Sequence, residues 1–233
     1  MQIPAHLLNE HYNDRYFDVV NALEESFHIF INGNNILERL QIIPDNNTFN
    51  IGETGFGAGR NLIALMEQCT KNALSNTVIN YHSVELHPIT ASRMSSILSG
   101  FKESAGQHIK NLVDAYKEID ITQMGWQRFI VKSTSGIINV NLWIGEALEM
   151  VTALDLNCDA WFLDGHGPKT NPLMWRTELL SAIAQKTVPG GTFATYTVAG
   201  HVFRTLKACG FEVTKYQGYG GKKSVMKGKL IKP

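Results

Sequence analysis

Short apolar runs alternate along the chain with longer segments whose apolar residues recur every three or four positions. The short runs predict strands and the periodic segments predict helices. The expected strands cover residues 48–52, 78–85, 137–145, 158–165 and 191–198. The expected helices cover residues 59–71, 88–100, 146–154 and 177–188. Such alternation indicates a doubly wound α/β fold with a mostly parallel sheet.

The end of the chain departs from this alternation. After an expected helix at residues 201–210, two strands are expected at 211–218 and 224–231. The segment between them, GYGGKK, suits a hairpin and is too short for a helical crossover. The last strand is therefore expected to be antiparallel, in a C-terminal hairpin.

Two further segments fit the pattern less well. Residues 104–136 read as a helix to about Ile119 and then as an irregular piece, which we interpret as an insertion. Residues 12–43 contain the alternating runs YFDVV and FHIFING, which predict a small β hairpin beside the sheet. We therefore expect one compact unit, with an N-terminal β extension at residues 1–45 packed on a main domain at 46–233.

Composition narrows the class of protein. The 233 residues are 44% hydrophobic and 18% charged, which is an ordinary globular composition without room for a second full domain. The sequence has neither an apolar run of about 20 residues nor a signal-peptide pattern at its start, so we expect a cytoplasmic protein without membrane contact. Cys69, Cys158 and Cys209 are far apart and form no C-x-x-C pair, so we expect buried thiols and no bound metal.

The net charge of zero hides an asymmetry. The chain after residue 203 has one acid, Glu212, and eight basic residues: Arg204, Lys207, Lys215, Lys222, Lys223, Lys227, Lys229 and Lys232. Lysines 222, 223 and 227 suit contacts with nucleic-acid phosphates. The alternative is a solvated edge strand whose lysines oppose aggregation.

A glycine cluster, Gly52-Glu53-Thr54-Gly55-Phe56-Gly57-Ala58-Gly59, lies where the first expected strand turns into the first helix. Glycine allows close backbone approach to a ligand, and the helix start offers free N–H groups, so the cluster predicts a nucleotide-binding turn. Arg60 replaces the third glycine of a dinucleotide fingerprint, and no phosphate-loop Lys-Ser or Lys-Thr follows. The pattern therefore favours a ligand with an adenosine and no pyrophosphate.

Acidic residues follow the next strands. Glu85 ends the second strand, where an acid accepts hydrogen bonds from ribose hydroxyls in doubly wound folds. Glu146 follows the third and could bind an adenine amino group. The alternatives are a solvated strand-end carboxylate for Glu85 and a helix N-terminal acid for Glu146.

Asp164 ends the fourth strand, at the sheet edge where ligands bind in open α/β folds. An amine must be neutral to accept a methyl group, yet an aliphatic amine titrates at roughly 10.4. A carboxylate at this place would orient the ammonium and help to remove its proton, so we predict this role for Asp164. The alternative is a cap for the following turn.

The segment from His166 to Trp175 is rich in turn formers, and it also carries Met174 and Trp175. Loops with large apolar side chains beside a ligand site often cover a substrate, so a lid is expected. The alternative is that Trp175 packs in the core.

Four stretches resemble the methyltransferase domain of the bacterial tRNA 5-methylaminomethyl-2-thiouridine biosynthesis protein (MnmC/MnmD type). They are DRYFDVVNALEESFHIF, GETGFGAGRN, DAWFLDGHGPKTNPLMW and PGGTFATYTVAGHVFRTLKACGFEVTKYQGYGGKK. The resemblance implies a class I, Rossmann-like fold and S-adenosylmethionine-dependent methylation of the 5-aminomethyl group on a tRNA wobble uridine. It also implies a donor site formed by Glu53, Thr54, Gly55, Phe56, Gly57, Gly59, Asn61, Glu85, Glu146 and Asp164. The implied substrate contacts are His166, Pro168, Lys169, Met174, Trp175, Lys222 and Lys223.

The chain departs from the family pattern in three places. His166-Gly167 stands where the family has Phe-Ala, the loop lysine is shifted to Lys169, and Glu146 replaces an expected aspartate. The flavin-dependent oxidase domain of bifunctional members does not follow in this sequence, so we expect only the final methylation. Two other functions stay open: a methyltransferase of the same fold acting on a small-molecule or protein amine, and a non-catalytic RNA-binding module. The sequence does not fix the oligomeric state, and a monomer is the simplest expectation.

Overall fold

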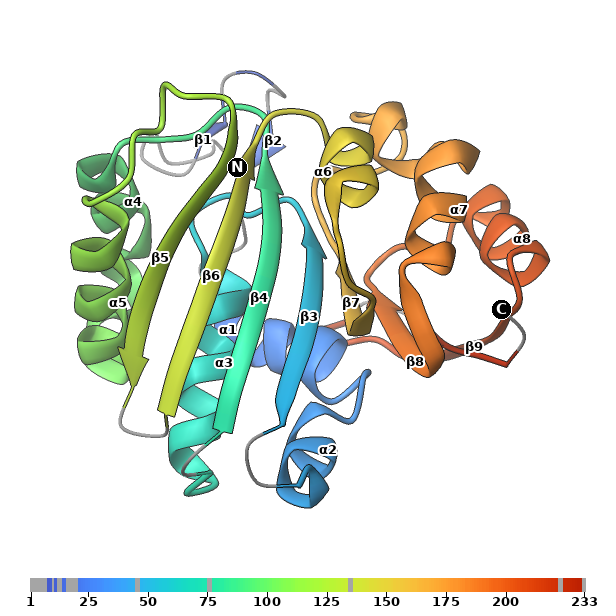
Figure 1. Cartoon of the computed structure of the whole chain (residues 1–233), viewed down its shortest axis with the longest axis horizontal. Helices are drawn as coiled ribbons and strands as arrows, with labels where there is room; N and C mark the ends of the chain where they lie inside the picture. Colours follow the sequence, from blue (N-terminus) through green and yellow to red (C-terminus); the bar gives the residue numbers. More distant parts are fainter. Residues whose placement is uncertain are drawn as a thin grey trace.

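The fold is built on one large sheet, seen in a computed structural model (Figure 1). The structure describes residues 8–9, 11, 14–15, 21–44, 47–74, 77–133, 136–221 and 224–231. The sheet has eight strands in the order β5-β6-β4-β3-β7-β8-β10-β9. Their bounds are β3 Thr48–Thr54, β4 Thr77–Glu85, β5 Gly125–Ser133, β6 Gly136–Ile144, β7 Cys158–Leu163, β8 Thr187–Thr195, β9 Phe211–Gln217 and β10 Ser224–Leu230.

The strand directions confirm the expected fold class. Strands β6, β4, β3, β7 and β8 pair in parallel. Strand β10 is antiparallel to both of its neighbours, β8 and β9, which makes the predicted C-terminal hairpin. Because the parallel strands all end at one edge, the acids that follow them are brought together there.

Two groups of helices cover different parts of the sheet. Helices α3 (Arg60–Lys71), α4 (Ala91–Ile97) and α5 (Lys102–Tyr116) lie behind β3 to β6 in Figure 1, where α3 and α5 bury apolar side chains against these strands. Helices α6 (Ala147–Ala153), α7 (Thr177–Gln185) and α8 (Gly200–Ala208) form a second core with β7 and β8. Two short 3-10 helices adjoin these groups: η3, Leu98–Phe101, follows α4 in the first core, and η4, Pro172–Trp175, precedes α7 in the second.

The predicted N-terminal β hairpin is wrong for the run FHIFING. Residues 22–31 and 36–42 are helical: α1 Ala22–Ser26, the π-helix η2 Phe27–Ile31 and α2 Ile36–Ile42. Ile29, Phe30 and Ile31 are all buried, whereas a strand would send alternate residues to opposite faces. Residues 16–20, the other half of the predicted hairpin, lie outside the described part. Leu8–Asn9 and Asp14–Arg15 pair as two short strands, β1 and β2.

The irregular piece predicted around Trp126 and Phe129 is also wrong. These residues lie in β5, which pairs antiparallel with β6 along nine residue pairs. Phe129 and Val131 are buried while their neighbours in β5 are exposed, which is the period of a half-buried edge strand.

Two predicted helix boundaries are shifted. The helix expected from residue 88 begins after Thr90, whose hydroxyl accepts a hydrogen bond from the Arg93 backbone N–H. Pro189-Gly190-Gly191, expected as a stop signal, lies inside β8, next to an irregularity in the pairing with β7. A proline is tolerated at such a bulge because no ladder hydrogen bond is required of it.

Gly52 packs tightly against a neighbouring side chain in the centre of the sheet. A Cβ there would lie 2.4 Å from two ring atoms of the fully buried Trp161. Gly52→Ala is therefore expected to lower the free energy of unfolding by about 1–3 kcal/mol, as overpacked cores do. Urea denaturation measures this, with Gly106→Ala in α5 as the control, because a Cβ at Gly106 meets no atom within 4 Å. The control should gain about 0.5–1 kcal/mol, and equal stability of Gly52→Ala and wild type would contradict the prediction.

None of the helices in the described ranges is long and apolar enough to cross a membrane.

Candidate active site

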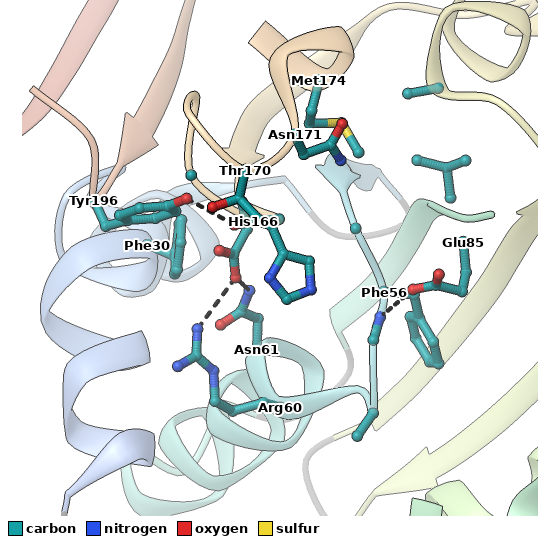
Figure 2. A pocket seen from close by; sticks show the side chains of 18 of the residues that line it. Phe30, Phe56, Arg60, Asn61, Glu85, His166, Thr170, Asn171, Met174 and Tyr196 are labelled. Carbon is teal, nitrogen blue, oxygen red and sulfur yellow. Dashed lines mark hydrogen bonds and ion pairs between the residues drawn. The ribbon is translucent and has the colours of Figure 1, made fainter. Parts of the chain in front are cut away.

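A cavity of about 1120 Å³ lies at the carboxyl ends of the parallel strands (Figure 2). Its lining comes from the glycine turn after β3 and the start of α3, the residues that follow β4, β6 and β8, the segment after β7, the turn between β9 and β10, and the N-terminal helices. Figure 2 shows Arg60 and Asn61 on one side, and Thr170, Asn171 and Met174 of the loop on the other. The expected meeting of the strand ends is therefore present in one cavity.

The glycine turn after β3 contains three glycines with positive φ, a backbone conformation that other residues rarely adopt. Gly55, Gly57 and Gly59 have φ angles of +102°, +55° and +77°. A Cβ at Gly55 would come within 3.1 Å of the Gly165 Cα, so glycine allows the turn and the loop after β7 to approach each other. Gly55 and Gly57 line the cavity, whereas Gly59 caps α3 and faces Leu112.

Glu85 and Glu146 both line the cavity and both also hold backbone N–H groups. Glu85 accepts hydrogen bonds from the Gly57 N–H at 2.8 Å and the His87 N–H at 2.9 Å. Glu146 caps α6 by accepting from the Leu148 N–H at 3.0 Å, and it pairs with Arg176 at 2.9 Å. The helix-terminal interpretation of Glu146 is thus correct, and the same side chain is also part of the cavity wall.

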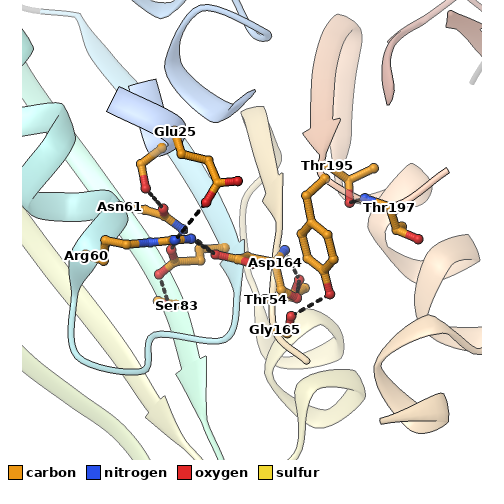
Figure 3. A network of polar contacts seen from close by, with 12 residues as sticks. Glu25, Thr54, Arg60, Asn61, Ser83, Asp164, Gly165, Thr195 and Thr197 are labelled. Atoms are coloured by element: carbon orange, nitrogen blue, oxygen red, sulfur yellow. Dashed lines mark hydrogen bonds and ion pairs between the residues drawn. The ribbon is translucent and has the colours of Figure 1, made fainter. Parts of the chain in front are cut away.

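Asp164 stands at the floor of the cavity in a polar network (Figure 3). Its Oδ2 accepts from Asn61 Nδ2 at 2.7 Å and from Arg60 Nη2 at 3.1 Å. The Thr54 hydroxyl accepts from the Asp164 N–H and donates to its carbonyl, both at 3.0 Å. Glu25 lies 3.6 Å from Arg60 on the far side of the guanidinium. The backbone and the carboxylate of Asp164 are therefore both fixed, and the side chain is bound to the first turn of α3.

Glu53 lies beneath this floor and does not line the cavity. It accepts hydrogen bonds from Asn61 Nδ2 at 2.9 Å and from the Ser83 hydroxyl at 2.6 Å. Burial, with a smaller contribution from the charge of Asp164, raises its pKa to about 7, although both hydrogen bonds act in the opposite direction. Asn61 thus joins Glu53 to Asp164, and its own Oδ1 accepts from Ser26 at 2.6 Å.

The loop after β7 divides into lining and packing residues. His166 and Met174 line the cavity. Trp175 is buried, donates to the His166 carbonyl at 2.9 Å and packs edge-on against Tyr196, so the core alternative for Trp175 is correct. Pro168 and Lys169 are not among the lining residues, and Lys169 is exposed. Lys222 and Lys223 lie outside the described residues.

Several lining residues were not predicted. Phe30 and Glu25 come from the helices mistaken for a hairpin, and Tyr196 donates to the Gly165 carbonyl at 2.7 Å. Arg60 could have been predicted, because it begins α3 directly after the glycine turn and so lies beside the strand ends. From the sequence alone, Arg60 is interpreted only as the replacement of a fingerprint glycine. Across the described residues, no three His, Cys, Asp or Glu side chains are grouped so as to hold a metal ion.

Comparisons with known proteins agree with this geometry. Residues 106–231 match the model of a family described as S-adenosyl-L-methionine-dependent methyltransferase. The bifunctional protein MnmC for tRNA 5-methylaminomethyl-2-thiouridine biosynthesis from Ectopseudomonas mendocina is 37% identical over 221 residues, covering 95% of this chain and 33% of the relative. The MnmC protein of Chromobacterium violaceum is 35% identical over 222 residues, with the same two coverages. The chain thus spans about a third of the length of these relatives.

The crystal structure of MNMC2 from Aquifex aeolicus shares the fold, with a TM-score of 0.74 at 19% identity over 97% of this chain and 67% of that one. The family model matches more than half of the chain, and the carboxyl edge of the sheet carries the glycine turn and the acids. Together these findings establish S-adenosylmethionine as the methyl donor. The chain belongs to the family of S-adenosyl-L-methionine-dependent methyltransferases.

Proposed function

We propose that this chain methylates the 5-aminomethyl group of a tRNA wobble uridine, with or without a 2-thio group. The observation that carries the proposal is Asp164, a carboxylate fixed by Asn61 and Arg60 on the floor of a cavity that also takes the methyl donor. The relatives named for this tRNA modification match 95% of the chain, including this segment.

The donor end of the cavity suits an adenosine. The backbone at Gly55 and Gly57 approaches the ligand without a side chain in between, Glu85 is placed to accept from ribose hydroxyls, and Glu146 to accept from the adenine amino group. When bound, S-adenosylmethionine supplies an electrophilic methyl group on a sulfonium. The residues of the chain need only hold it and orient the amine in line.

The ribose role of Glu85 can be tested by binding alone. Glu85→Ala removes a charged hydrogen-bond acceptor and the group that ties Gly57, so the affinity for S-adenosylmethionine should fall by about tenfold to a hundredfold. Calorimetry measures the dissociation constant. Glu149→Gln, an exposed acid on α6, is the control and should bind like wild type. Unchanged affinity in Glu85→Ala would remove Glu85 from the donor site.

The acceptor end is where Asp164 acts. The carboxylate attracts the ammonium form of the substrate, aligns its nitrogen and takes its proton, which frees the lone pair for attack. Phe30, Met174 and Tyr196 line the same cavity and exclude water from the amine. The volume of about 1120 Å³ exceeds that of many single-ligand pockets and leaves space for a nucleoside beside the donor.

The function is tested with the purified chain, S-adenosylmethionine and tRNA that carries 5-aminomethyl-2-thiouridine. Mass spectrometry of the nucleosides should show a mass gain of one methyl group on that nucleoside. Methylation of a small-molecule or protein amine with tRNA untouched would overturn the proposed substrate. Absence of S-adenosylmethionine binding would leave only a non-catalytic RNA-binding module.

A further inference from the structure

A second cavity, of about 650 Å³, lies away from the donor site. It is formed by the middle of β4, β5 and β6 and by the end of α6 with the loop that follows it. In Figure 1 the helices α3, α4 and α5 lie behind these strands, and the near faces of β5 and β6 are open. An open face is ordinary for the antiparallel strand β5 but unusual for β6, which pairs in parallel with β4, because parallel strands are normally covered on both faces.

The open face carries carboxamides where a covered sheet would carry aliphatic residues. Asn50, Asn80 and Asn139 lie side by side on β3, β4 and β6. Asn80 donates to Asn50 at 2.9 Å, and Asn139 donates to Asn80 at 3.0 Å. In the next row, Asn141 of β6 stands between His82 of β4 and Arg128 of β5. Hydrogen-bonding groups therefore line the cavity floor.

His82 has an unpaired ring nitrogen beside this cavity. It is only 6% exposed and lines the cavity, yet its Nε2 makes no hydrogen bond. An unpaired buried polar atom is costly, and because Nε2 is closed to solvent a ligand in the cavity would reach it only after a small movement of the ring. Burial lowers the pKa of His82 to about 4, so the ring is neutral at pH 7 and can donate or accept. The ring lies edge-on to Trp126, 6.3 Å between centroids.

We propose that this cavity binds one nucleotide of an RNA strand, with its base beside Trp126 and its phosphate at Arg128. A base offers the flat face that an aromatic side chain contacts, and its polar edge matches the carboxamides and the neutral imidazole. Asp155, also in the lining, can accept from base or ribose donors. Arg128 is exposed at the rim, where a phosphate would lie next to solvent. The assignment deepens the proposed function, on which it rests for the choice of tRNA as the RNA.

The test compares two exposed cations on the same face of β5. Arg128 lines the cavity, and Lys132 lies four residues further along the strand, outside it. Binding of labelled tRNA is measured by fluorescence anisotropy at fixed salt for Arg128→Glu, Lys132→Glu and the uncharged variant Asn141→Ala. Arg128→Glu should weaken binding at least about tenfold, which corresponds to the loss of one charge-assisted contact. Asn141→Ala should weaken it less, Lys132→Glu should bind like wild type, and all three should keep wild-type affinity for S-adenosylmethionine.

A second experiment distinguishes a free nucleotide from a nucleotide within tRNA as the ligand. Uridine and adenosine monophosphates are titrated into the protein, and tryptophan fluorescence reports their binding. A response lost in Arg128→Glu together with weaker tRNA binding supports the proposal. A response to free nucleotide with unchanged tRNA binding overturns it, as do equal effects of Arg128→Glu and Lys132→Glu. A change of oligomeric state in Arg128→Glu without any effect on RNA would assign the face to protein contacts and also overturn it. If wild type binds tRNA through Arg128 but does not methylate it, the proposed reaction fails and this site stands.

Discussion

Asp164→Asn is expected to lower kcat for methyl transfer to tRNA by about 10²- to 10⁴-fold, the range that a positioned acid or base contributes. Asparagine keeps the shape of the side chain and can still accept from Asn61 and Arg60 through its Oδ1. It lacks the charge that attracts the ammonium and cannot take its proton. The loss should therefore appear in kcat, measured with saturating S-adenosylmethionine and tRNA.

The matched control is Asp114→Asn. Asp114 is an exposed aspartate on α5 that pairs with Lys110 of the same helix and with Lys117 directly after it. Its kcat should equal that of wild type. Calorimetry should show that Asp164→Asn still binds S-adenosylmethionine, which separates a lost chemical step from a lost donor site. A wild-type kcat in Asp164→Asn would show that the amine loses its proton to another group or to water.

The strand-end residues could be predicted because two local signals coincide. The pattern of apolar residues and the turn-forming residues between the runs located β3, β4, β6 and β7. Parallel strands bring their carboxyl ends to one edge of the sheet. Glu85, Glu146 and Asp164 therefore fell into the cavity without knowledge of any long-range contact. The glycines were identified for the same reason, since positive φ is a property of the residue itself.

The other side of the cavity could not be found in this way. Phe30 meets Phe162 across more than a hundred residues of chain, with ring centroids 5.5 Å apart. Whether FHIFI forms a strand or a helix depends on that packing, because its local pattern fits either structure. Trp175 illustrates the converse: an aromatic residue in a loop suggested a substrate contact, but its partner Tyr196 lies on a different segment and holds it in the core.

Glu53→Gln is expected to make the protein more stable than wild type by about 3 kcal/mol at neutral pH, and equally stable near pH 4.5. The pKa of Glu53 is raised from 4.5 to about 7 in the folded chain, chiefly by burial. Between these two pH values the unfolded chain loses the proton and the folded chain keeps it, so stability falls as pH rises. A difference of about 2.5 pH units corresponds to about 3 kcal/mol. Glutamine resembles the protonated acid and does not titrate, so the variant does not lose stability in this way as the pH rises.

The comparison with the variant is needed because His82 acts in the opposite direction. Its folded pKa is lowered to about 4, so its contribution to stability is lost as pH falls below 6.5. The wild-type curve alone therefore mixes two opposing slopes, whereas the difference between wild type and Glu53→Gln isolates Glu53.

Urea denaturation across pH 4.5 to 8 measures this difference. Glu118→Gln, an exposed acid beyond α5, should follow the wild-type curve. A difference that grows with pH up to about 7 means that Glu53 holds its proton through the acidic range in the folded chain. A constant difference would instead mean that Glu53 is ionised in the folded chain as readily as in the unfolded one, held by Asn61, which also donates to Asp164.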